Sequence, residues 1–150
     1  MQDFVHLHVH TQYSLLDGQA SVSRLVDKAM KDGMKGIAVT DHGNMFGIKE
    51  FTNYVNKKNS GPKGEIKDLK KRIAGIESGE IECEDKEAEI ADCRAKMAEA
   101  ESKLFKPIVG CEMYVARRTM DKKEGKPDQS GYHLIVLAKN EKGYHNLIKL

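Results

Sequence analysis

The chain has 150 residues, of which 39% are hydrophobic and 32% charged, enough for one domain with a single sizeable core. The net charge of +2, the absence of tryptophan and an aromatic content of 6% argue against a nucleic-acid surface built on basic patches or stacking platforms. We find no apolar run long enough for a membrane span and no start of a signal peptide, and three widely spaced cysteines indicate free thiols, so we expect a cytoplasmic protein.

The first predicted element is a strand within the segment FVHLHVHTQYSLLDG, residues 4–18. Strand side chains alternate between two faces, so the histidines share one face and the apolar residues share the other. The histidines are His6, His8 and His10, and the apolar residues are Val5, Leu7 and Val9. A polar solvent face is one interpretation. A metal-binding face is favoured, because neutral imidazole is the commonest metal ligand.

A strand–helix alternation follows. Apolar spacing predicts an amphipathic helix over 21–32, with Ser21 as its N-cap and Gly33 just past its end. A short apolar strand is predicted over 36–40 and a second helix over 46–57. The apolar side of the second helix consists of Ile48, Phe51 and Val55. This alternation predicts a parallel sheet in an α/β fold.

Residues 59–104 break the pattern, since lysine and glutamate are dense in them. Two apolar stripes at three- and four-residue spacing, separated by Gly79, predict an antiparallel helical hairpin. The segment contains no histidine, so we interpret its charges as a solvated face and assign it no catalytic role.

The strand pattern returns after this segment. Alternation over 107–116 puts Glu112 and Tyr114 on one face. After a polar loop, another strand carries His133 near its start. The helix that follows it runs up to Leu150, so we expect this chain to be a fragment of a longer domain.

A set of polar residues lies on or beside the predicted strands: His6, His8, His10, Asp17, Asp41, His42, Glu112 and His133. In parallel α/β folds, functional groups gather at the carboxyl ends of the strands. His10, Asp41 and His42 satisfy this rule. His133 fits it only if its strand runs antiparallel or a bulge shifts its register.

Histidine and carboxylate ligands without cysteine suit zinc, manganese or iron, and the carboxylates also favour magnesium. Three histidines along one strand face exceed the reach of a single ion, and a carboxylate such as Glu112 can bridge two ions. Taken singly, Asp41 is as well explained as a helix cap, and a lone Glu or His as a hydrogen-bonded core residue. The prediction of a metal site therefore depends on the set occurring together.

The motifs HVHT followed by DG, then AVTDHGN, GCE and YHLIVLAKN, resemble in this order the PHP (polymerase and histidinol phosphatase) family. The resemblance covers residues 1–58 and 105–150, and it is closest to members at the N-termini of bacterial replicative DNA polymerases. Residues 59–104 depart from that pattern, and we interpret them as an insertion.

The resemblance implies that the chain is part of a distorted (β/α)7 barrel with up to three divalent cations (Zn, Mn, Fe or Mg) in its mouth. The implied ligands are His8, His10, Asp17, His42, Glu112 and His133. His6 stands where relatives often carry Asp, so we expect it to support a ligand rather than bind metal. Glu112 and Asp41 are predicted as catalytic residues.

The resemblance also implies part of a DNA-directed DNA polymerase that acts in replication, with primer-template DNA and other replicase subunits as partners. The metal site suits phosphodiester hydrolysis, including 3′→5′ exonuclease proofreading, whereas nucleotide transfer requires carboxylates from elsewhere in the parent protein. Two alternatives stay open: a free-standing phosphoesterase of the histidinol-phosphatase type, and a metal-stabilised, non-catalytic scaffold. We expect the fragment alone to be inactive because its ligand set is incomplete.

Overall fold

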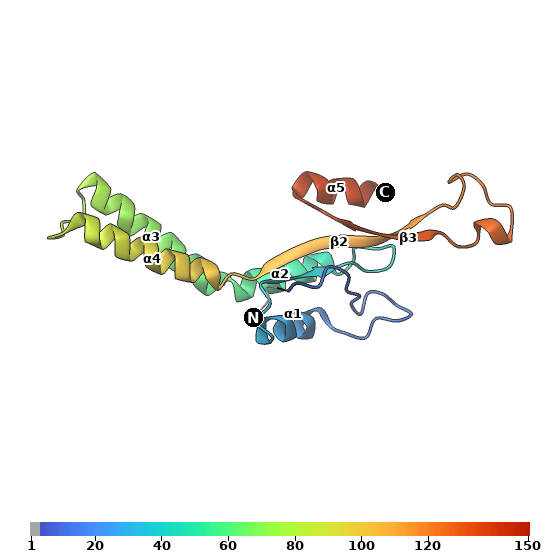
Figure 1. Ribbon diagram of the computed structural model, residues 1–150, viewed down its shortest axis with the longest axis horizontal. Coiled ribbons are helices and arrows are strands. Elements are labelled where there is room, and N and C mark those ends of the chain that lie inside the picture. Colours follow the sequence, from blue (N-terminus) through green and yellow to red (C-terminus); the bar gives the residue numbers. More distant parts are fainter. Residues whose placement is uncertain (1–3) are drawn as a thin grey trace. The chain divides into compact units, whose positions relative to one another are not determined.

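A computed structural model describes residues 4–150, which form five α-helices and a three-stranded sheet (Figure 1). The elements in chain order are α1 (Val22–Lys31), β1 (Gly36–Val39), α2 (Ile48–Lys58), α3 (Ser60–Ser78), α4 (Lys86–Ser102), β2 (Lys106–Val115), the 3-10 helix η1 (Lys126–Asp128), β3 (Tyr132–Leu137) and α5 (Glu141–Lys149). The chain divides into two compact units, one made of the residues up to Val55 with Lys106–Leu150, the other of Asn56–Phe105. Within residues 4–150, no helix combines the length and apolar character that a membrane crossing requires.

The sheet has the order β1-β2-β3, with the long strand β2 in the centre (Figure 1). β1 pairs with β2 in parallel, as predicted, from Gly36 opposite Lys106 to Val39 opposite Val109. β3 pairs with β2 in antiparallel orientation, which is one of the two alternatives left open for the strand of His133. Parallel neighbours usually need a helical crossover, and the connection from β2 to β3 holds only the single turn η1.

The N-terminal segment lies alongside β1 but is not a regular strand, which corrects the prediction for residues 4–10. The amide of Ala38 donates to the carbonyl of His6, and the amide of Thr40 donates to that of Val9, both at 2.9 Å. The donors Ala38 and Thr40 are two positions apart on β1, whereas their acceptors His6 and Val9 are three positions apart on the N-terminal segment. One extra residue is accommodated by a bend at Leu7 and His8, as in a β-bulge.

The helices of the first unit follow the predicted periodicity. α1 begins after Ser21 and ends at Asp32, and Gly33 adopts the left-handed conformation with φ of 79°. The predicted apolar face of α2 is buried, as are all four residues of β1. Their packing forms the core beneath the sheet, which includes Val22, Val26, Ile37, Val39, Ile48, Phe51 and Val55.

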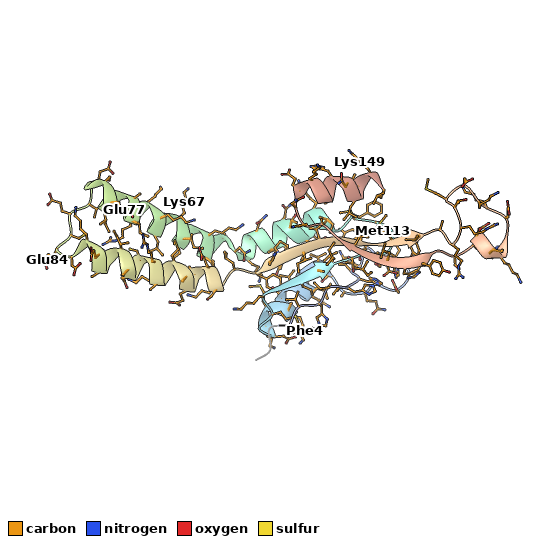
Figure 2. All side chains as sticks on the ribbon, turned by 45° about the horizontal axis from the view of Figure 1, so that its top comes forward. Phe4, Lys67, Glu77, Glu84, Met113 and Lys149 are labelled. Carbon is orange, nitrogen blue, oxygen red and sulfur yellow. The ribbon has the colours of Figure 1, made fainter. Side chains whose placement is uncertain are left out.

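The second unit contains α3 and α4, which lie side by side (Figure 1). Ile66, Ile76, Cys93 and Ala100 are buried. Gly79 ends α3 with φ of 82°, and Arg72 of α3 pairs with Glu89 of α4 at 2.6 Å. Charged side chains such as those of Lys67, Glu77 and Glu84 project from the unit (Figure 2).

Candidate metal centre

The carboxylate of Glu112 is the centre of the candidate site. Its side chain is 1% exposed, and its two oxygens face four imidazoles. Oε2 lies 2.6 Å from Nε2 of His8 and 2.8 Å from Nε2 of His10. Oε1 lies 3.2 Å from Nδ1 of His42 and also contacts Nδ1 of His133.

The sheet brings these side chains together from distant parts of the sequence. His42 follows β1 directly and forms an isolated parallel bridge with Glu112 on β2. His133 stands opposite Tyr114 because β3 is antiparallel, so the start of β3 meets the end of β2. The antiparallel direction thus removes the difficulty that the position of His133 poses for a wholly parallel sheet.

Asp17 reaches the same cluster from the loop before α1. Its Oδ2 lies 2.9 Å from Nε2 of His42 and 3.5 Å from Nδ1 of His10. The loop is tightly built: the amides of Asp17 and Gly18 both donate to the carbonyl of Ser14. A Cβ at Gly18 would stand only 1.8 Å from the carbonyl oxygen of Thr11, so this turn requires glycine.

Three groups of potential ligand atoms result, each with its atoms within 4.8 Å of one another. Glu112, His10 and His42 each belong to two of the groups. The groups are His8, His10 and Glu112; His10, Asp17 and His42; and His42, Glu112 and His133. The structure thus brings together all six residues that the sequence predicts as ligands.

The buried oxygen Oε1 of Glu112 fits a cation better than the protein groups around it. Two ring nitrogens face it, Nδ1 of His133 and, at 3.2 Å, Nδ1 of His42, but among the described residues neither is aligned as a hydrogen-bond donor to it. Nδ1 of His42 already lies 3.0 Å from the hydroxyl of Tyr114. Buried polar atoms are nearly always satisfied, and a bound cation is one recognised partner for such an oxygen. The donor set of imidazoles and carboxylates is one that divalent transition metals accept.

Both carboxylates of the cluster are held in their charged form. Burial by itself would raise the pKa of Glu112, but hydrogen bonds from His8 and His10 and the charges of His42 and His10 outweigh it and lower that pKa. The pKa of Asp17 is lowered chiefly by its hydrogen bond to His42. At neutral pH the cluster therefore presents two anions.

Tyr114 is a site residue that the sequence analysis places on the face of Glu112 without giving it a role. Its hydroxyl lies 3.0 Å from Nδ1 of His42, and its ring meets that of His133 edge-on at 4.9 Å between centroids. The alternation of strand side chains was the signal that could have identified it.

Asp41, which is predicted to be catalytic, belongs to none of the three groups of potential ligands found among the described residues. Its carboxylate is buried and accepts hydrogen bonds from the amide of Thr11 at 2.6 Å, the hydroxyl of Thr11 at 2.8 Å and the hydroxyl of Ser14 at 2.8 Å. These bonds occupy both oxygens with groups of one loop. The geometry is that of a residue that positions the loop carrying Asp17.

His6 also lies apart from the cluster. Its ring meets Phe4 edge-on at 4.7 Å between centroids, and it lines a cavity of about 330 Å³ together with Val9 and residues of α1. We predicted that His6 supports a metal ligand, but none of these contacts joins His6 to one of the six predicted ligands. The bend at Leu7 and His8 is the reason, because it ends the strict alternation that would align His6 with His8 and His10.

Comparison with known proteins gives consistent matches. A DNA polymerase III subunit alpha of Borreliella burgdorferi is 39% identical over 148 residues, and one of Treponema pallidum is 38% identical over 148; each alignment covers 98% of this chain and 9% of the relative. The corresponding subunit of Aquifex aeolicus is 32% identical over 155 residues, covering 99% of this chain and 10% of the relative. The chain thus spans about a tenth of the length of these relatives. The model of the PHP domain matches residues 6–150, and the chain therefore belongs to the PHP domain family.

Proposed function

We propose that this chain is the N-terminal part of the PHP domain of a bacterial DNA polymerase III alpha subunit, located in the cytoplasm. The similarity to alpha subunits over nearly the whole chain supports this assignment. Primer-template DNA and the other replicase subunits would be partners of the full-length protein. The rest of a distorted (β/α)7 barrel would come from residues outside this chain.

The metal ligands would be His8, His10, Asp17, His42, Glu112 and His133. A neutral imidazole offers one free lone pair, so His10 and His42 can each serve only one ion although each belongs to two groups. The carboxylate of Glu112 can serve two ions, one through each oxygen. His8, His10 and Glu112 would hold one ion, Glu112 and His133 would contribute to another, and His42 would join Asp17 through Nε2, since Nδ1 of His42 faces the hydroxyl of Tyr114.

The reaction we assign to the complete site is hydrolysis of a phosphodiester at a 3′ end. Bound divalent cations supply hydroxide from water near neutral pH and stabilise charge on phosphate oxygens. In this chain, Glu112 holds the negative charge at the centre, Tyr114 orients His42, and Asp41 positions the loop of Asp17. The predicted catalytic role of Asp41 is thereby replaced by a positioning role.

The observation that carries this proposal is the buried carboxylate of Glu112, whose two oxygens face four imidazoles. Buried charged groups in proteins are paired or coordinate metals, and the same carboxylate and imidazoles can do either. A free-standing phosphoesterase of the histidinol-phosphatase type has the same chemistry, but the relatives at 32–39% identity named above are polymerase subunits.

The test is made in the full-length protein with Glu112→Gln, which retains the size of the side chain and removes its charge. The substitution should lower the bound metal, measured by elemental analysis, and abolish release of nucleotides from a labelled 3′ end. Chelation should do the same, and manganese or zinc should restore activity to the native protein only. A metal-loaded native protein that hydrolyses no 3′ end, combined with unfolding on Glu112→Gln, would favour the non-catalytic scaffold.

Residues 59–104 are proposed as a charged helical insertion without a catalytic role. Two of their ion pairs, Lys96 with Asp92 and Lys103 with Glu99, are exposed pairs one helical turn apart. Pairs of this kind contribute little to stability and are typical of a solvated helix face. Side chains of this unit do not occur in any of the three groups of potential ligands in the described chain.

A further inference from the structure

A pocket of about 410 Å³ adjoins the candidate metal centre and is not accounted for by the metal ligands. Its volume lies within the range of roughly 300–1,000 Å³ that is typical of small-molecule sites. Two of its lining residues, Asp17 and His42, belong to one of the groups of potential metal ligands. A phosphate ester bound with its phosphate at Asp17 and His42 would place the part of the molecule attached to that phosphate in this pocket.

The walls of the pocket are mainly apolar. Leu15 and Leu16 line it from the loop before α1, and Tyr114 lines it from β2. Leu15 is 87% exposed and Leu16 is 103% exposed, although the loop that carries them is held by internal hydrogen bonds. Adjacent exposed apolar side chains beside a polar site form a contiguous apolar surface, and such surfaces often bind ligands.

The polar groups of the walls are already engaged. The amide of Asn44 donates to the carbonyls of Tyr13 and His42, and its oxygen accepts from the amide of Phe46. The hydroxyl of Tyr13 donates to Glu50, and that of Ser14 donates to Asp41. Apart from the residues of the metal centre, these walls therefore offer apolar surface rather than free hydrogen-bonding groups.

We propose that this pocket receives the nucleobase of the nucleotide at the 3′ end, through apolar contact with Leu15 and Leu16 and with the ring of Tyr114. This inference rests on the proposed function. It goes further by stating which part of the DNA substrate binds in the pocket. Bases have apolar faces in common and differ in their hydrogen-bonding edges. Because the walls offer apolar contact and few free polar groups, binding should not discriminate among the four bases.

The kinetic test compares two single-stranded DNA oligonucleotides in the full-length protein, one with a normal 3′ nucleotide and one whose 3′ residue lacks the base. The native protein should show a KM for the normal substrate lower by about 5-fold or more, the low end of the contribution of one stacked base. The double substitution Leu15→Ser and Leu16→Ser should remove most of this difference without changing hydrolysis of the abasic substrate. The matched control is Met120→Ser, because Met120 is an apolar side chain that is 90% exposed and does not line this pocket.

Equal KM values for the two substrates, or a preference that survives the double substitution, would overturn the nucleobase pocket and leave phosphodiester hydrolysis standing. Four oligonucleotides that differ only in the base of their 3′ nucleotide (A, C, G or T) should give similar KM values. A strong preference for one base would contradict the proposed recognition by apolar contact.

A binding measurement separates this inference from the proposed function. An oligonucleotide with 2-aminopurine at its 3′ end and a hydrolysis-resistant phosphorothioate as its last linkage is titrated with the metal-loaded full-length protein, so that hydrolysis does not contribute. Quenching that the double substitution removes, and that Met120→Ser retains, would support the pocket even if no hydrolysis of any 3′ end is found. Absence of quenching in the native protein would overturn it.

Discussion

The hydroxyl of Tyr114 lies 3.0 Å from Nδ1 of His42, while the other ring nitrogen of His42 lies 2.9 Å from Asp17. The ring is thus held from both sides, by a residue of β2 and by a residue of the loop before α1. Groups that hydrogen-bond the far nitrogen of a metal-binding histidine set its orientation and its basicity. Tyr114 is therefore part of how the candidate site is oriented, although it is not itself a predicted ligand.

Tyr114→Phe should weaken metal binding by the full-length protein by about 10–100-fold, the usual effect of losing such an orienting group. The ring remains, so the apolar wall of the adjoining pocket and the stability of the fold should change little. The measurement is a competition titration with a chromophoric chelator. Tyr132→Phe is the control, since Tyr132 lies on β3 with its ring beneath Arg117. Equal metal affinity in the two variants would argue against an orienting role.

Asp41→Ala should destabilise the protein, because it leaves the amide and hydroxyl of Thr11 and the hydroxyl of Ser14 without their buried acceptor. The expected loss is about 1–3 kcal/mol in the free energy of unfolding, measured by urea denaturation. Asp92→Ala removes an exposed ion pair with Lys96 and should cost less than about 1 kcal/mol. If Asp41→Ala abolished hydrolysis without lowering stability or metal content, a catalytic role would be supported instead.

The lowered pKa of Glu112 predicts a specific dependence of stability on pH in the metal-free protein. A carboxyl whose pKa is lower in the folded state stabilises that state above its unfolded pKa, which is about 4.3 for Glu. This contribution is lost as the pH falls from about 4.3 through the folded pKa. The stability difference between the native protein and Glu112→Gln should therefore shrink as the pH falls through this window. Urea denaturation at a series of pH values in chelator checks this, and a constant difference would contradict the lowered pKa.

The three cysteines should differ in reactivity. Cys111 and Cys93 are buried, whereas Cys83 is partly exposed. Burial raises the pKa of the Cys111 thiol, which reduces the reactive thiolate further. A thiol reagent at neutral pH should modify Cys83 first and reach the other two only on unfolding, as peptide mass spectrometry would reveal. Modification of Cys111 at the rate of Cys83 in the folded protein would show that the strand β2 opens locally.

Removal of the charged helical segment tests whether it contributes to the metal centre. Joining Lys58 to Phe105 in the full-length protein should leave metal content and nucleotide release unchanged, because the potential ligands come from the other unit. The deletion also removes Asn59, whose side chain bonds the backbone of Phe105 at both its amide and carbonyl. A modest loss of stability is compatible with the proposal, whereas loss of metal from a folded protein would refute it.

The sequence by itself was sufficient for the features that depend on local periodicity. The apolar spacing of α1 and α2 and the alternation that puts Glu112 and Tyr114 on one face arise from neighbouring residues, so they can be identified without a structure. The resemblance to the PHP family adds the six candidate ligands, because they stand at the matching positions of its motifs.

The tertiary structure decided the rest, because it depends on pairings between residues far apart in the chain. Periodicity does not define strand direction, so the antiparallel pairing of β3 that brings His133 beside Glu112 became apparent only in the sheet. The bend at Leu7 and His8, which separates His6 from the cluster, follows from the register against β1. The hydrogen bonds that tie Asp41 to Thr11 and Ser14 have the same origin, since a side chain takes its role from whichever groups the fold brings within reach.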